Sequence, residues 1–193
     1  MAMLLKHPQW LMYEEYIPKE TCERWLELGK TMPAQEAKTF RTGQEDDGEN
    51  DGARKTQIRW LPHDDTFQEI YDLCYKLAAE ANEKFNVDYD TLPPIQFTEY
   101  LEPGYHYDFH HDIDWNRQDG RNRKMSIVIQ LTDPEEYEGG DFAFKHHISP
   151  SSDAVRKQGT VLLFMPYQEH AVMPITSGSR TSLVGWFEGP NWR

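Results

Sequence analysis

Cysteine is scarce in this sequence. Only two cysteines, Cys22 and Cys74, occur among 193 residues. Two thiols are too few for the disulfide framework that stabilises many small secreted domains, so a disulfide-dependent fold is excluded. Both cysteines lie in segments whose apolar spacing predicts helices, and we expect them to be buried free thiols.

Long apolar runs are also lacking. No segment approaches the roughly 20 apolar residues that a helix needs to cross a bilayer. Residues 1–10 have neither the apolar length nor the small-residue cleavage site of a signal peptide. We therefore expect a cytoplasmic protein without a membrane partner.

Basic residues are few relative to acidic ones. The 20 Lys and Arg residues oppose 33 Asp and Glu residues, which gives a formal net charge of −13. Such a chain repels a phosphate backbone, so we expect no nucleic-acid partner. Part of the acidic charge lies in residues 44–52 (QEDDGENDG), a polar stretch that is typical of an exposed loop.

The length and the apolar content of the chain predict one domain, residues 1–193, with two parts of different texture. The N-terminal part, about 1–90, contains a predicted helix at 18–30, a short strand at 55–60 and a second helix at 66–85. A capping box from Thr66 to Glu69 is expected to open that second helix. The sequence does not indicate an oligomeric state.

The C-terminal part, about 95–188, has short runs of β-branched and aromatic residues between turn residues. Strands are expected at 96–101, 106–111, 124–131, 141–144, 160–164, 171–174 and 181–188. This order predicts a mainly β (α+β) protein, a sandwich or jelly roll against which the N-terminal helices pack.

The pair His110 and Asp112 is the strongest metal-binding candidate in the sequence. Alternate residues of a β-strand point to the same face, so both side chains can reach one cation. Asp112 is expected to end a strand beside the loop that follows, which leaves access for a substrate. An imidazole and a carboxylate, completed by a further histidine, make a facial triad suited to Fe(II).

Two other His-x-Asp patterns compete with this pair. His63 and Asp65 come just before a predicted helix, where aspartates serve the helix end, so we interpret them as structural. His106 and Asp108 are expected on the same strand face as His110, as an outer contact of the metal or a contact of the substrate. Three further histidines, His7, His146 and His147, are predicted to be solvated.

A second segment offers the third ligand. An apolar run at 160–164 is followed by a turn and then by His170, which would return the chain toward the metal. Ten residues later, Arg180 and Ser182 share one face of a predicted strand. A guanidinium beside a hydroxyl makes a good clamp for a carboxylate.

In their order and spacing these residues resemble the prolyl 4-hydroxylase-like branch of the iron(II)/2-oxoglutarate oxygenases, in particular its microbial and viral members. The resemblance covers residues 95–187 and favours His110 and Asp112 over the other His-x-Asp pairs. The matching positions are Tyr100, Gly104, Tyr107, His110, Asp112, His170, Arg180 and Trp186.

The resemblance implies a double-stranded β-helix (cupin-like) core and a specific set of cofactors. His110, Asp112 and His170 would hold Fe(II), and Arg180 with Ser182 would bind the distal carboxylate of 2-oxoglutarate. Tyr100 and Tyr107 would complete the cosubstrate contacts. Dioxygen would be the second cosubstrate, and ascorbate a possible reductant.

The implied activity is hydroxylation of a C–H bond with release of succinate and CO2. Peptidyl proline is the leading substrate by analogy, and a free amino acid or another peptide side chain is the alternative. Loops 115–123 and 145–158 are expected to flank the entrance. One departure bears on prolyl specificity: animal prolyl hydroxylases have a tyrosine on the strand that here reads Ser126 to Leu131.

Three rival interpretations stay open. A non-catalytic, cupin-like binding module would have no need for both a complete ligand set and Arg180. A structural zinc site is disfavoured because the ligand set contains no thiolate. Nucleic-acid dealkylases of this superfamily carry a second arginine six residues after the first, and here that position is Trp186.

Overall fold

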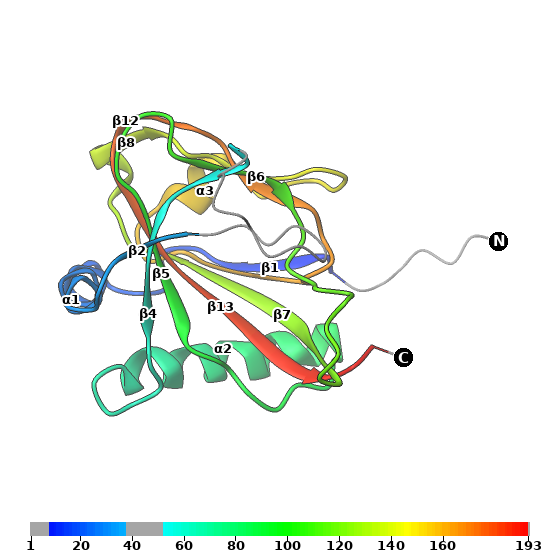
Figure 1. Ribbon diagram of the computed structural model, residues 1–193. Coiled ribbons are helices and arrows are strands. Elements are labelled where there is room, and N and C mark those ends of the chain that lie inside the picture. Colours follow the sequence, from blue (N-terminus) through cyan, green and yellow to red (C-terminus); the bar gives the residue numbers. More distant parts are fainter. Residues whose placement is uncertain (1–7, 38–51, 193) are drawn as a thin grey trace.

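The computed structural model describes residues 8–37 and 52–192. The elements, in chain order, are β1 (Trp10–Tyr13), α1 (Lys19–Lys30), β2 (Gln35–Glu36), β3 (Arg54–Lys55), β4 (Gln57–Leu61), α2 (Gln68–Phe85), β5 (Ile95–Tyr100), β6 (His106–His110), β7 (Arg121–Gln130), β8 (Tyr137–Gly139), β9 (Phe142–Phe144), α3 (Ser152–Arg156), β10 (Val161–Phe164), β11 (His170–Val172), β12 (Ile175–Gly178) and β13 (Arg180–Pro190). The predicted mainly β architecture with N-terminal helices is confirmed (Figure 1).

Most strands belong to two antiparallel sheets. The larger sheet has the order β1-β10-β7-β13-β5-β4-β2, and the smaller one has the order β3-β6-β11-β9. The strands β8 and β12, which are far apart in the sequence, form a third, two-stranded antiparallel sheet. Figure 1 shows α2 below one face of the larger sheet, with β6, β8 and β12 above the other face.

The outer face of the larger sheet packs against α1 and α2. Alternate residues of its strands, among them Phe97, Ile127 and Leu183, join the apolar stripes of both helices in one buried cluster. Cys22 and Cys74 lie in this cluster as free thiols, as predicted, and burial raises the pKa of each to about 12. This face provides the main hydrophobic core.

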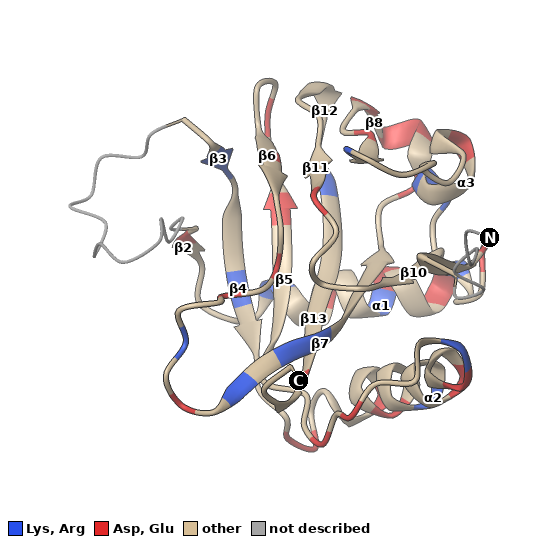
Figure 2. Ribbon diagram, turned by 90° about the vertical axis from the view of Figure 1, so that its right-hand side faces the viewer, with Lys and Arg blue, Asp and Glu red and all other residues tan. Residues whose placement is uncertain are grey.

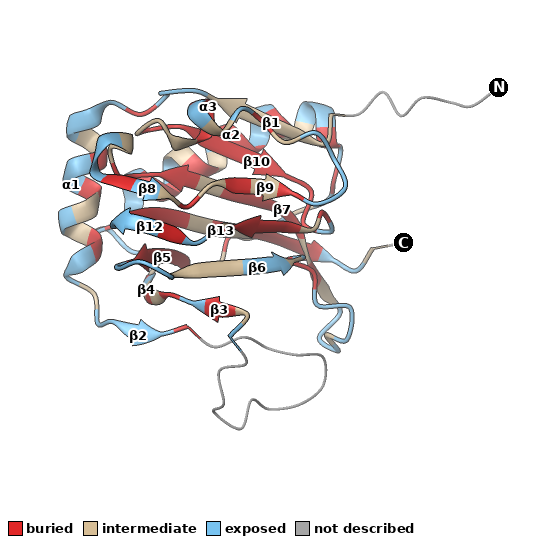
Figure 3. Ribbon diagram, turned by 90° about the horizontal axis from the view of Figure 1, so that it is seen from above, coloured by how far each residue is buried: buried red, intermediate tan, exposed pale blue. Residues whose placement is uncertain are grey.

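The inner face of the larger sheet turns toward the smaller sheets. A second apolar cluster lies here, and includes Tyr100, Phe142, Phe164 and Val172. Figure 3 shows the contrast along this layer: strands β7, β10 and β13 are mostly buried, whereas β6 is intermediate to exposed. The polar residues of the candidate site lie between these inner faces.

Several local predictions were wrong. The capping box does not form: α2 begins at Gln68, the Asp64 side chain accepts the backbone N–H of Thr66, and Glu69 binds Arg24 and Trp25 of α1 instead. A tertiary ion pair has displaced the local cap. The strands β1, β2, β8 and β12 and the short helix α3 were missed, since each is only two to five residues long.

Close packing between α1 and the sheet gives a first prediction. A Cβ at Gly29 would lie 2.3 Å from two ring atoms of the buried Phe97. Alanine favours a helix over glycine by about 1 kcal/mol, but overpacking a core costs about 1–3 kcal/mol. We expect Gly29→Ala to lower the free energy of unfolding in urea, whereas Lys30→Ala, at the exposed neighbour, changes it by less than about 0.5 kcal/mol. A stabilised Gly29→Ala variant would contradict this packing.

Among the described residues, no helix has the length and apolar character needed to span a bilayer. The predictions for His7 and for residues 44–51 of the acidic loop lie outside the described residues.

Candidate metal and cosubstrate site

Three predicted ligands come together where the smaller sheet faces the larger one. His110 ends β6 and His170 begins β11, and the two are directly opposite each other in the antiparallel ladder. Asp112 follows two residues after the end of β6, so the strand is shorter than predicted. The ligand atoms of these three residues all lie within 4.8 Å of one another.

The two imidazoles have the tautomer that a metal requires. Nδ1 of His110 lies 2.8 Å from the carbonyl oxygen of Asp108, and Nδ1 of His170 lies 2.9 Å from that of Gln168. A carbonyl oxygen only accepts hydrogen bonds, so each Nδ1 carries the proton and each Nε2 presents a lone pair. The two Nε2 atoms lie 3.7 and 3.8 Å from the Asp112 carboxylate, too far for hydrogen bonds but suitable for a shared cation.

The electrostatics of the group also fit a cation. Burial, together with the neighbouring His170, holds the pKa of His110 well below its ordinary value, so its ring is neutral. Burial alone would raise the pKa of Asp112, but His170, His110, Arg123 and the hydrogen bond from Ser126 together lower it. The group therefore offers two imidazole nitrogens and one carboxylate, a donor set that fits Fe(II).

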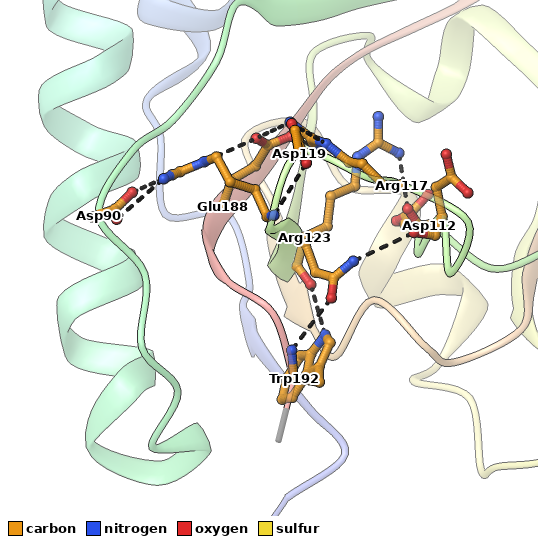
Figure 4. Close-up of polar contacts among 10 residues, drawn as sticks. Asp90, Asp112, Arg117, Asp119, Arg123, Glu188 and Trp192 are labelled. Carbon is orange, nitrogen blue, oxygen red and sulfur yellow. Dashed lines mark hydrogen bonds and ion pairs between the residues drawn. The ribbon is translucent and has the colours of Figure 1, made fainter.

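Asp112 is held on several sides. Its Oδ2 accepts a 2.6 Å hydrogen bond from the hydroxyl of Ser126, a fully buried residue of β7. Its backbone N–H donates to the carbonyl of Pro166, and its carbonyl accepts from Nη1 of Arg123 at 3.1 Å (Figure 4). The carboxylate is thus oriented before any ligand binds.

The Ser126 contact gives a second prediction. Groups that orient a metal ligand typically contribute about 10- to 100-fold in metal affinity. We expect Ser126→Ala to weaken Mn(II) binding about tenfold in a titration, and Ser126→Thr, which keeps the hydroxyl, to retain most of the affinity. Equal affinity of the alanine variant and the native protein would show that the contact does not orient Asp112.

A cavity extends from the three ligands toward Arg180 on β13. Arg180 is only 2% exposed, and its Nη1 has no hydrogen-bond partner among the described residues. Ser182 lies on the same face of β13, and the Arg180 guanidinium lies 5.2 Å from the ring centre of Tyr100 on β5. A buried guanidinium with an unused donor is what the distal carboxylate of a small diacid requires.

Two sets of side chains complete the cavity wall. One set is apolar, and the other is polar or aromatic. The full lining is Arg54, Gln96, Thr98, Tyr100, Tyr107, His110, Asp112, Val128, Phe142, His170, Val172, Arg180, Ser182, Val184 and Trp186. All seven residues predicted to bind the metal or the cosubstrate are in this set.

A β-bulge corrects one prediction about β6. Opposite the two-residue step from His170 to Val172, β6 takes a three-residue step from His110 to Tyr107. Tyr107 therefore faces the cavity and stacks on the His110 ring at 3.5 Å. His106 instead contacts the carbonyls of Gly104 and Gly52, so it does not share the face of His110 as predicted. Asp108, with 66% of its side chain exposed, lies outside the cavity.

The other predictions about histidines and loops hold in part. His63 is structural, as predicted, and stacks on Tyr71 at 4.0 Å. His146 is exposed, as predicted, but also pairs with Glu169 at 2.9 Å. Loop 115–123 is shorter than predicted because β7 begins at Arg121, and loop 145–158 contains α3.

Three functional candidates were missed in the sequence. Gln130 lies on β7, and its Nε2 donates a 3.3 Å hydrogen bond to the hydroxyl of Tyr137 on β8. Ser126 is one of several small residues in β-strands, and no sequence signal marks it. Arg54 lies on β3, beside the acidic segment, and its sequence context predicts an exposed, solvated side chain.

The two facing sheets, the three ligands and the buried guanidinium define the class of metal- and 2-oxo-acid-binding double-stranded β-helix proteins. Comparison with known proteins agrees. A family model described as the 2OG-Fe(II) oxygenase superfamily matches residues 95–188. Residues 95–188 of this chain are therefore similar to the oxygenase domain of that superfamily.

Curated relatives and solved structures extend the comparison. A PKHD-type hydroxylase from Synechococcus sp. (strain CC9311) is 40% identical over 82 residues, which is 42% of this chain and 36% of that protein. The match thus spans well under half of the relative. Among solved structures, the viral collagen prolyl hydroxylase of Paramecium bursaria Chlorella virus-1 has a TM-score of 0.70 at 19% identity, and the alignment covers 97% of this chain and 99% of that one.

A third comparison is a prolyl hydroxylase from Trichoplax adhaerens, solved with a peptide fragment of the hypoxia inducible factor oxygen degradation domain. It has a TM-score of 0.66 at 14% identity, covering 93% of this chain and 83% of that one. Similarity at this level shows a shared fold, and the predicted double-stranded β-helix is confirmed.

Proposed function

We propose that residues 1–193 form one domain that acts as an Fe(II)- and 2-oxoglutarate-dependent hydroxylase. His110, Asp112 and His170 hold the metal, while Arg180 and Ser182 bind the distal carboxylate of 2-oxoglutarate. One observation carries this proposal: two Nε2 lone pairs and a carboxylate converge at one end of a cavity whose other end has a buried, unused guanidinium N–H.

The bound metal and cosubstrate supply the oxidising power, using dioxygen and releasing succinate and CO2. The chain's residues do the rest. The backbone carbonyls of Asp108 and Gln168 fix the imidazole tautomers, and Ser126 orients the carboxylate. Val128 and Val172 line the path between the metal ligands and Arg180 and exclude water from it.

For the substrate we propose a C–H bond of a peptide or an amino acid, with peptidyl proline as the leading candidate. The support is the naming of the relatives as PKHD-type and prolyl hydroxylases, one of them solved with a peptide. Trp186 and Tyr107 line the cavity near the metal ligands, and the buried Nε1 of Trp186 has no partner among the described residues. A free amino acid is the alternative substrate.

The main rival is a non-catalytic, cupin-like binding module. It is disfavoured because the chain has both a complete ligand set and a separate carboxylate clamp. Nucleic-acid dealkylation is disfavoured by Trp186, which stands where such enzymes have a second arginine, and by the net charge of −13.

The deciding experiment combines two readouts. Purified protein is incubated with Fe(II), 2-oxoglutarate, ascorbate and dioxygen, and a library of peptides and amino acids is screened by mass spectrometry for the gain of one oxygen. Succinate is measured in parallel. We expect substrate-stimulated succinate formation together with a hydroxylated product. Absence of succinate with every substrate would overturn the enzyme proposal.

A further inference from the structure

The arginines of this acidic protein divide into two groups. Five of those described form ion pairs with carboxylates: Arg24, Arg59, Arg117, Arg121 and Arg156. The other three have no carboxylate within ion-pair distance among the described residues: Arg54, Arg123 and Arg180. Figure 2 shows basic residues concentrated at the start of β7, where Arg121 and Arg123 lie.

All three arginines without such a partner lie at the candidate site. Arg180 ends the cavity, and Arg123 donates to the backbone of Asp112 and covers Trp186 at 3.8 Å. Arg54 lines the cavity wall. Arg180 is accounted for by the cosubstrate, and Arg54 has no role in the proposed function so far.

Arg54 is held in a fixed position. It is 6% exposed, its Nε donates a 2.8 Å hydrogen bond to Thr56, and its guanidinium lies 4.4 Å from the ring centre of Tyr107. Tyr107 in turn stacks on His110. The three side chains form a column, so the Arg54 charge lies one aromatic ring away from a metal ligand.

When metal and cosubstrate are bound, the charge of Arg54 is not balanced by another group that lines the cavity. Among the groups that line or fill the cavity, which do not include Arg123, a divalent metal, the Asp112 carboxylate, the dianionic cosubstrate and the Arg180 guanidinium sum to zero. Arg54 adds one positive charge to this cavity, no carboxylate of residues 8–37 or 52–192 pairs with it, and a buried charge without a partner is unfavourable. A ligand that binds after the cosubstrate and carries one carboxylate would neutralise it with charge-assisted hydrogen bonds.

We propose that Arg54 binds a carboxylate of the substrate, so that this hydroxylase selects an anionic substrate, with its acidic group close to the carbon that is oxidised. The inference rests on the proposed function. The carboxylate has two possible sources, a C-terminal α-carboxylate or the side chain of an adjacent acidic residue. Arg180 already binds the distal carboxylate of the cosubstrate. Arg54 therefore affects the affinity for different substrates and has little effect on the affinity for 2-oxoglutarate.

The test uses the loaded but unreactive protein. Mn(II) and N-oxalylglycine, an inert analogue of 2-oxoglutarate, fill the metal and Arg180 sites, and their affinities are measured first. Two matched pairs of probes are then titrated: N-acetylproline against N-acetylprolinamide, and N-acetyl-Pro-Asp-amide against N-acetyl-Pro-Asn-amide. Binding near the metal is followed by Mn(II)-induced broadening of the probe's proton resonances.

We expect the acidic member of at least one pair to bind about ten- to a hundredfold more tightly than its amide. Which pair shows the preference identifies the source of the carboxylate. Arg54→Gln should abolish the preference, Arg54→Lys should keep part of it, and neither should change N-oxalylglycine affinity more than twofold. The matched control is Lys55→Gln, which removes a charge from the adjacent exposed residue and should leave the preference intact.

Two results would overturn the inference alone: equal binding within both pairs, or a loss of N-oxalylglycine affinity in Arg54→Gln as large as its loss of acid binding. The second result would assign Arg54 to the cosubstrate. Failure of Mn(II) or N-oxalylglycine to bind at all would remove the proposed function, and this inference with it.

Discussion

Asp112→Ala is expected to abolish substrate-stimulated succinate formation and to weaken Mn(II) binding by more than about a hundredfold. The carboxylate is the anionic member of the three-ligand group, and its loss leaves only the two imidazoles. Orienting groups around a metal ligand already contribute about 10- to 100-fold in affinity, so removal of a ligand itself should exceed that. The measurements are a metal titration and a succinate assay.

The sequence offers a matched control for this variant. Asp108 belongs to the neighbouring His-x-Asp pattern on the same strand, but its side chain is 66% exposed and lies outside the cavity. Asp108→Ala should therefore leave both metal affinity and turnover within about twofold of the native protein. If Asp108→Ala lost activity and Asp112→Ala kept it, the assignment of the ligands would be wrong.

Arg180→Gln is expected to raise the KM for 2-oxoglutarate roughly a hundred- to a thousandfold while leaving the metal affinity nearly unchanged. Loss of one partner from a buried charge pair costs about 3–5 kcal/mol. Glutamine keeps a hydrogen-bond donor but not the charge, so the penalty falls on the bound dicarboxylate. Succinate formation at increasing 2-oxoglutarate measures the change in KM.

Arg59→Gln controls for the general cost of removing a partly buried, paired arginine. Arg59 pairs with Glu99 at 2.9 Å and does not line the cavity. Its loss should lower the free energy of unfolding without changing the KM for 2-oxoglutarate. An unchanged KM in Arg180→Gln, with the variant folded, would show that the cosubstrate is held elsewhere.

The residues that we propose as metal ligands and as carboxylate clamp could be selected from the sequence because each lies in a motif whose geometry is local. His110 and Asp112 are two residues apart near a strand end, and Arg180 and Ser182 alternate on one strand. The sequence also contained the apolar run and turn that bring His170 back. Strand order was not needed to see that these groups belong together.

What the sequence did not reveal depends on pairing between distant strands. The bulge in β6 is defined only by its ladder with β11, so simple alternation placed His106 and Asp108 on the face that Tyr107 occupies. Arg54 reaches the cavity because a two-residue strand pairs with β6, and so short a strand has no periodicity. The same limit applies to the capping box, where Glu69 prefers Arg24 of a different helix.

The strands of the larger sheet face the helices on one side and the cavity on the other, so different residues determine stability and substrate specificity. Along β5 and β13, residues that pack under the helices, such as Phe97 and Leu183, alternate with residues that line the cavity, such as Gln96 and Val184. Mutations at positions that line the cavity can change substrate specificity without disturbing the packing of the helices. Substitutions that change the cavity can therefore accumulate without a prior gain in the stability of the hydrophobic core.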